Sequence, residues 1–271
     1  MKTQKFKRVL AGFLAGAMVV TSVAFTEPVN SYAAAKTVTV HTQKELNAAL
    51  KNLKTSKKTI VIKTAKAKTF TIKKASYKKA TLKVNAAKAK IVNKATFASV
   101  QIADAQSVTE KGNANTITDK DKNVKLVIAK DAQKTIVVAN KQDGTLNLVA
   151  NGDLKAVKVK AAQKVVLTGS STAIPAITVK KEGAEITSSI PVNVSLNANA
   201  VVTLNKGAEA SSVKVGNTSV VATVQNNTDA KIVIKDAEGK ETVVEAGQSV
   251  KTNTSTDPSK DNDTNNSDNS S

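Results

Sequence analysis

The chain has 271 residues, of which 41% are hydrophobic but only 3% are aromatic, and it contains no cysteine. It carries 41 basic and 21 acidic residues, for a formal net charge of +20. This composition excludes a small fold held by disulfides and predicts a large core of aliphatic side chains.

The first 35 residues have the pattern of a secretory signal peptide. Four basic residues precede an apolar stretch at positions 9–25, and small residues at 31–35 suit signal peptidase. A transmembrane anchor is the competing interpretation, but Gly12 and Gly16 interrupt the stretch. No later segment is apolar enough to span a bilayer. We therefore expect cleavage near Ala35, export, and a mature chain without a transmembrane anchor.

The mature chain opens with a short strand around 37–40 and one amphipathic helix. Thr42-Gln43-Lys44-Glu45 has the capping-box pattern, in which the threonine and glutamate side chains satisfy amides at a helix start. Apolar residues follow at i, i+3, i+4 and i+7, namely Leu46, Ala49, Leu50 and Leu53. Since the next elements are strands, we expect this helix to cover the end of a β structure.

Short strands then recur about every ten residues from Ile60 to Val243, with apolar and polar residues alternating. Turn residues such as Asp143-Gly144 and Gly216-Asn217 separate them. The predicted inward pairs are Ile60/Ile62, Phe70/Ile72, Leu82/Val84, Val100/Ile102, Leu126/Ile128, Ile136/Val138, Leu146/Leu148, Val157/Val159, Val165/Leu167, Ile177/Val179, Val192/Val194, Val202/Leu204, Val213/Val215 and Ile232/Ile234.

Two all-β architectures fit this pattern. Tandem sandwiches usually bury large aromatics, whereas the mature chain has only Phe70, Tyr77 and Phe97. A parallel β-helix stacks small branched residues and places asparagines at its corners, and it is the favoured prediction. At about 20 to 25 residues per turn, residues 36–251 make nine or ten turns. Residues 252–271 are polar and predict a disordered tail rich in Ser, Asn, Asp and Thr.

The opening of the mature chain also resembles a known family. The run Val38–Leu50 followed by Thr59–Ile62 is similar to the cap helix and first strand of right-handed parallel β-helix proteins of the pectate-lyase-like group. In particular it resembles the non-catalytic, adhesive branch found on bacterial surfaces. A Gly-x-Tyr turn often follows the first strand in the enzymes of the group, and Lys63–Lys66 stands there instead.

The residues needed for catalysis in that group have no clear counterpart. The resemblance implies, for the lyases, clustered acidic calcium ligands and a basic residue, commonly arginine, but the predicted mature chain has no arginine and only His41. Asp119, Asp121 and Asp131 form the densest acidic grouping, which indicates a weak calcium site or, more simply, soluble turns. We expect no catalytic residue and no cofactor; a divergent carbohydrate-active β-helix enzyme, a polysaccharide lyase or hydrolase, is the alternative.

The positive charge is concentrated near the amino-terminal end. Residues 36–100 contain 17 lysines and one acid, Glu45, whereas residues 101–251 contain 19 lysines and 15 acids. Lysines recur at about ten-residue intervals, at Lys63, Lys73, Lys83 and Lys94. If two turns stack them on the outer face, they favour a polyanionic partner; the competing interpretation is that outward lysines keep a flat sheet from aggregating.

These patterns predict a secreted, monomeric, non-enzymatic surface or matrix protein. We expect its β-helix to bind or space extracellular polymers such as anionic wall or host glycans, with a purely structural spacer as a further alternative. Specific nucleic-acid binding is a poor fit, because base readout and stacking use arginine and aromatic side chains.

Overall fold

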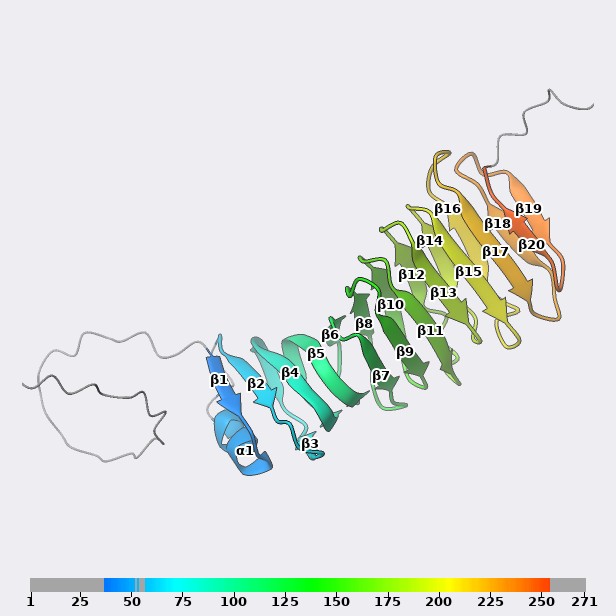
Figure 1. Ribbon diagram of the computed structural model, residues 1–271. Helices are drawn as coiled ribbons and strands as arrows, with labels where there is room; N and C mark the ends of the chain where they lie inside the picture. Colours follow the sequence, from blue (N-terminus) through cyan, green and yellow to red (C-terminus); the bar gives the residue numbers. More distant parts are fainter. Residues whose placement is uncertain (1–36, 52, 54–56, 254–271) are drawn as a thin grey trace, which may run out of the picture. The chain divides into compact units, whose positions relative to one another are not determined.

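The computed structural model describes residues 37–51, 53 and 57–253 (Figure 1). They form a parallel β-solenoid of about ten turns with one short helix near its amino-terminal end, which confirms the predicted fold class. The predicted signal peptide at 1–35 and the tail residues 254–271 lie outside the described residues.

The described residues form one helix and twenty strands. The elements are β1 (Thr37–Val40), α1 (Gln43–Lys51), β2 (Thr59–Lys63), β3 (Thr69–Ile72), β4 (Ser76–Asn93), β5 (Thr96–Glu110), β6 (Thr116–Asp119), β7 (Asn123–Ile128), β8 (Thr135–Ala139), β9 (Thr145–Ala150), β10 (Leu154–Val159), β11 (Lys164–Gly169), β12 (Ala176–Val179), β13 (Ala184–Ser188), β14 (Asn193–Leu196), β15 (Ala200–Asn205), β16 (Ser212–Val215), β17 (Ala222–Asn227), β18 (Ile232–Lys235), β19 (Glu241–Val244) and β20 (Ser249–Lys251).

Two long faces are built by parallel pairing between successive turns. Face A contains β1, β2, the middle of β4, the first part of β5, and then β6, β8, β10, β12, β14, β16 and β18. Face B contains β3, the ends of β4 and β5, and the odd-numbered strands β7 to β17, which lie side by side in Figure 1. A short third face pairs Ser76–Tyr77 with Thr96–Phe97.

The turns of the solenoid differ in length. Near the amino-terminal end Thr37 pairs with Thr59, whereas further along Ala184 pairs with the much nearer Ala200. The later turn is shorter than the length expected from the sequence. Most pairs keep their register, because a one-residue slip would turn inward side chains outward, and the variation falls on the corners and on register shifts in the pairs β4–β5 and β10–β8.

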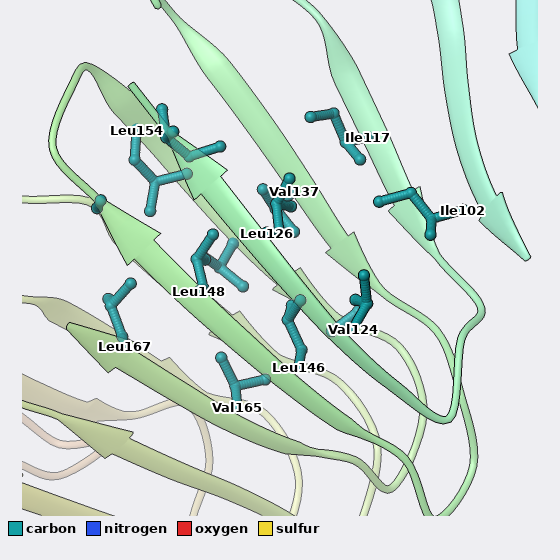
Figure 2. Close-up of a cluster of buried hydrophobic side chains, with 14 of the residues drawn as sticks. Ile102, Ile117, Val124, Leu126, Val137, Leu146, Leu148, Leu154, Val165 and Leu167 are labelled. Atoms are coloured by element: carbon teal, nitrogen blue, oxygen red, sulfur yellow. The ribbon is translucent and has the colours of Figure 1, made fainter. Parts of the chain in front are cut away.

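The core is a set of columns of aliphatic side chains that run along the stack. Figure 2 shows part of it, in which Leu126, Leu148 and Leu167 come from paired positions of β7, β9 and β11. All three are fully buried. Burying such a side chain contributes about 2 kcal/mol, so the repeated columns replace the large aromatics of other β folds.

The predicted inward pairs are buried as expected, except in β8, where Ile136 is only half-buried and Val138, although buried, belongs to the outward alternation. In β8 the residues that point into the core column are Val137 and Ala139, because Val137 pairs with Ile117 and Val157. The prediction of Ile136 and Val138 was therefore wrong by one residue. The run is apolar at every position, so alternation gave no signal, and the register of the neighbouring turns decided it.

Different devices cover the two ends of the solenoid. At the amino-terminal end Leu46 and Leu50 of α1 are buried, and the helix contacts β1, β2 and β3. The Glu45 amide donates to Thr42 Oγ1 at 3.2 Å, and the Glu45 carboxylate accepts the His41 amide at 2.7 Å, close to the predicted capping box.

At the other end the parallel course stops. Strand β19 pairs antiparallel with β18, and β20 pairs antiparallel with β17. Thr252 and Asn253, which the sequence analysis counted with the tail, contact this last turn: Thr252 Oγ1 accepts the Ala222 amide at 3.0 Å, and Asn253 Nδ2 donates to the Val220 carbonyl at 2.7 Å. The described residues include no helix that could span a membrane.

Candidate anion-binding surface

A lysine-lined groove lies along the start of the face B strands in the first turns; we call it the flank groove. Two adjoining hollows of about 460 and 380 Å³ form it, and they share Lys90 and Gln106. Its described lining residues include no acid and are Ala67, Lys68, Thr69, Lys88, Lys90, Gln106, Ser107, Thr109, Lys125 and Val127.

Strand register sets the spacing of the charges in the flank groove. Thr69, Lys90, Ser107 and Lys125 occupy one outward column on four successive turns. Because paired strands lie about 4.8 Å apart, the backbones of Lys90 and Lys125 are about 10 Å apart, with the serine between them. The groove thus alternates ammonium and hydroxyl groups along its length.

A second hollow, of about 480 Å³, lies where the face B strands end; we call it the corner hollow. Four successive turns contribute to it, in the segments 74–76, 94–96, 111–113 and 131–133. Three lysines line it, and Lys111 is paired with Asp131 at 3.6 Å between Nζ and Oδ1. Its described lining residues are Lys74, Ala75, Ser76, Lys94, Thr96, Lys111, Gly112, Asn113, Asp131 and Gln133.

A buried carboxyl supports the floor of the corner hollow. Glu110 has no exposed surface and accepts hydrogen bonds from Asn93 Nδ2 and Asn115 Nδ2, both at 2.9 Å, and from the Gly112 amide. Burial raises the pKa of Glu110 above its ordinary value, although these hydrogen bonds act in the opposite direction. With their partners in place, the two asparagines tie two successive turns together.

A second buried carboxyl lies at the end of β6. Asp119 accepts hydrogen bonds from Gln163 Nε2 at 2.6 Å and from the Asp121 amide at 2.9 Å, and burial raises its pKa to about 6. Asp121 in turn accepts the amides of Ala105 and Asn123. Asp119 and Asp121 thus accept hydrogen bonds from backbone amides, and Asp119 also accepts one from a side-chain amide.

The three acids considered for calcium are not assembled into one site. Asp131 lies beside Lys111 in the corner hollow, whereas Asp119 and Asp121 belong to the other corner, at the end of face A. Among the described residues, no group of three or more His, Cys, Asp or Glu side chains is placed to hold a metal ion.

The structure divides the four lysines singled out in the sequence into two kinds. Lys73 and Lys94 directly follow the paired residues Ile72 and Asn93, so they lie on successive turns at one corner, and Lys94 lines the corner hollow. Lys63 and Lys83 lie on face A, where Lys63 pairs with Asn85. The four lysines therefore lie in two neighbourhoods, because each interval of about ten residues carries the chain from one face of the solenoid to the next.

The sequence analysis singled out none of the four groove lysines, which are Lys68, Lys88, Lys90 and Lys125. A sequence pattern that could have identified them is a lysine just before or near the start of a face B strand. Lys68 precedes β3, and Lys90 and Lys125 lie on outward positions of their strands. Using that pattern requires knowing which strands share a face.

His41 contacts the start of α1 and the end of β2. Its Nδ1 lies 2.7 Å from the Lys63 carbonyl, and its amide donates to Glu45 at the helix cap. The histidine thus joins α1 to the end of β2, away from both lysine-lined hollows.

Comparisons with known proteins assign no family. No protein-family model, no curated protein and no solved structure matches this chain. The fold and the geometry of its surface are therefore the basis for a functional proposal.

Proposed function

We propose that this protein is an exported, non-enzymatic surface or matrix protein whose solenoid binds anionic extracellular polymers through the flank groove. It would be a functional counterpart of the adhesive β-helices that its opening residues resemble. The observation that carries the proposal is the column of Lys90, Ser107 and Lys125, flanked by Lys68 and Lys88, with no acid among the described residues of the groove.

A linear polyanion suits this groove for physical reasons. Its charges recur along the stack, as the charges of a polymer recur along its chain, so several weak contacts can form together. Each exposed lysine–anion contact contributes only about 0.2–1 kcal/mol, and binding depends on their number. The released counterions make such binding steeply dependent on salt.

The two buried carboxyls with raised pKa values lend no support to the carbohydrate-active enzyme. Glu110 and Asp119 have no exposed surface, and their oxygens accept hydrogen bonds from the protein's own amides. Neither can reach a polysaccharide in this arrangement, whereas general acid–base catalysis requires contact with the reacting group.

The test replaces the four groove lysines by glutamine in the mature chain, as Lys68→Gln, Lys88→Gln, Lys90→Gln and Lys125→Gln. All four are exposed, so the fold should remain. We expect affinity for a polymeric glycerol phosphate or a sulfated glycan to fall about tenfold or more at low salt, and the log–log salt slope to decrease by about two to three.

A matched control variant removes four exposed lysines from the later turns: Lys158, Lys180, Lys214 and Lys231. It has the same net charge as the groove variant. Equal losses of affinity in the two variants, or binding of the original chain that does not respond to salt between about 50 and 200 mM, would refute the flank groove as the binding site.

A further inference from the structure

The corner hollow differs from the flank groove in shape and chemistry. The flank groove is open along the stack, whereas the corner hollow is a more enclosed depression spanning four turns, about 14 Å at the strand spacing. Its polar lining combines lysines with hydroxyl and amide side chains, and none of its described lining residues is aromatic. It offers hydrogen-bond donors for a compact polar group and no surface for ring stacking.

Three kinds of donor converge on the hollow. Lys74, Lys94 and Lys111 supply ammonium groups, Ser76 a hydroxyl, and Asn113 and Gln133 amides, while the Thr96 hydroxyl donates to the Asn113 carbonyl. Ser76 and Thr96 are paired on neighbouring strands, and Asn113 and Gln133 form the next bridge of the same short face. The hydroxyls and amides are therefore held in register along one side.

The floor of the hollow is rigidly held. A Cβ added to Gly112 would overlap the Ala95 carbonyl oxygen and lie 2.6 Å from Glu110 Oε1, so only glycine fits there. The backbone at 111–113 is anchored below by the buried Glu110 and above by the bond between Thr96 Oγ1 and the Asn113 carbonyl at 3.0 Å. A site with a fixed floor loses little conformational entropy when it binds a ligand.

Three lysines around one hollow indicate an anionic ligand. Lysine acts as a compact point charge with three donors and is a common ligand of phosphate oxygens, which can accept from several ammonium groups at once. The neutral hydroxyl and amide groups beside the lysines can bond the hydroxyls of a polyol or sugar.

We propose that the corner hollow is a discrete site for a phosphate group carried on a hydroxyl-rich molecule. The phosphate contacts Lys94 and Lys111, and the neutral side chains Ser76, Asn113 and Gln133 contact the attached polyol. Asp131 limits the affinity, because it pairs with Lys111 and places a like charge beside the bound anion. This site goes beyond the proposed polymer binding, since it needs only a small phosphate ester and none of the flank groove lysines.

The decisive experiment compares two aspartate variants of the mature chain, Asp131→Asn and Asp229→Asn. Each adds one unit of net charge and frees one lysine from an exposed ion pair, since Asp229 pairs with Lys206 at 2.8 Å in the last turns. The probe is glycerol 3-phosphate, titrated by NMR while the amide signals of Gly112 and Asn113 are followed, with glycerol and inorganic sulfate as comparison ligands.

We expect Asp131→Asn to tighten glycerol 3-phosphate binding about three- to fivefold and Asp229→Asn to leave it unchanged. The Lys94→Gln, Lys111→Gln double variant should weaken it about tenfold, whereas Lys158→Gln, Lys214→Gln should not. Equal tightening by both aspartate variants, amide shifts spread over the whole solenoid, or sulfate binding as well as the ester would overturn the site. Because the polymer test uses other lysines and another ligand, either proposal can fail alone.

Discussion

The first and last turns of the solenoid share one backbone plan but differ in where they keep their charges. Residues 37–133 contain 21 lysines and six acids, and three of those acids, Glu110, Asp119 and Asp121, are buried. Residues 184–253 contain six lysines and seven acids, and their buried polar side chains are neutral: Ser188, Ser211, Asn226, Thr228 and Thr252.

This contrast shows that outer surface and corner chemistry vary independently of the core columns. In both regions most inward positions of the strands are filled by Val, Ile, Leu and Ala. The first turns combine a basic surface with buried carboxyls, which makes their stability sensitive to pH; the last turns use neutral corner residues, whose hydrogen bonds do not titrate.

The largest expected loss of stability follows from replacing a buried corner asparagine, and each of the two regions contains one that can be compared. Asn115 Nδ2 donates to Glu110 and to the Ala95 carbonyl, while Asn226 Nδ2 donates to the carbonyls of Ala230 and Val244. We expect Asn115→Ala to lower the free energy of unfolding by about 3–5 kcal/mol at pH 7, because a buried carboxyl loses a donor.

The dependence on pH separates the two asparagine variants in urea unfolding experiments. The cost of Asn115→Ala should be smaller at pH 4 than at pH 7, because burial raises the pKa of Glu110 and so favours its neutral form as the pH falls. The cost of Asn226→Ala, about 2–4 kcal/mol, should be the same at both pH values because its partners are neutral. A cost of Asn115→Ala that does not change with pH would contradict the role assigned to Glu110.

A smaller effect follows from the raised pKa of Asp119. The folded-state pKa is about 6 and the ordinary value is 3.8, so the folded state binds the proton more tightly. Its contribution to stability therefore falls as pH rises from about 4 to 6 and is constant above about 7, a change of at most about 3 kcal/mol.

Replacement of the Asp119 carboxyl by an amide tests whether this group makes stability fall as the pH rises. We expect Asp119→Asn to flatten the loss of unfolding free energy between pH 4.5 and 7, measured in urea. If Asp119→Asn has the same pH slope as the original chain, the buried carboxyl does not titrate in this range.

The smallest effects concern the two ends. Thr42→Ala removes an exposed helix cap and should cost about 1 kcal/mol. Thr252→Ala leaves the amide of fully buried Ala222 without its side-chain acceptor and should cost about 1–2 kcal/mol. Melting temperatures should fall by about 2–4 °C per kcal/mol. A Thr252→Ala variant as stable as the original chain would place the end of the folded unit at Lys251.

Much of the fold was predictable because its signals are local. Alternation at Leu146/Leu148 and at Val165/Leu167 marks strands, and Thr42 to Leu50 marks a capped helix, from neighbouring residues alone. The apolar run at Ile136–Ala139 was not predictable in this way, since both alternations are apolar and only its neighbours in the stack select the inward set.

The sequence by itself determined the repeated β architecture, the capping helix and the concentration of lysine near the amino-terminal end, because composition and short-range periodicity carry them. Only the tertiary structure decided which lysines share a surface. Strand register brings Lys90 into one column with Lys125 and sets Lys63 opposite Asn85, two positions beyond Lys83 on the neighbouring strand. This register depends on the lengths of the corners, which result from packing between turns. It cannot be read from the spacing of the lysines along the chain.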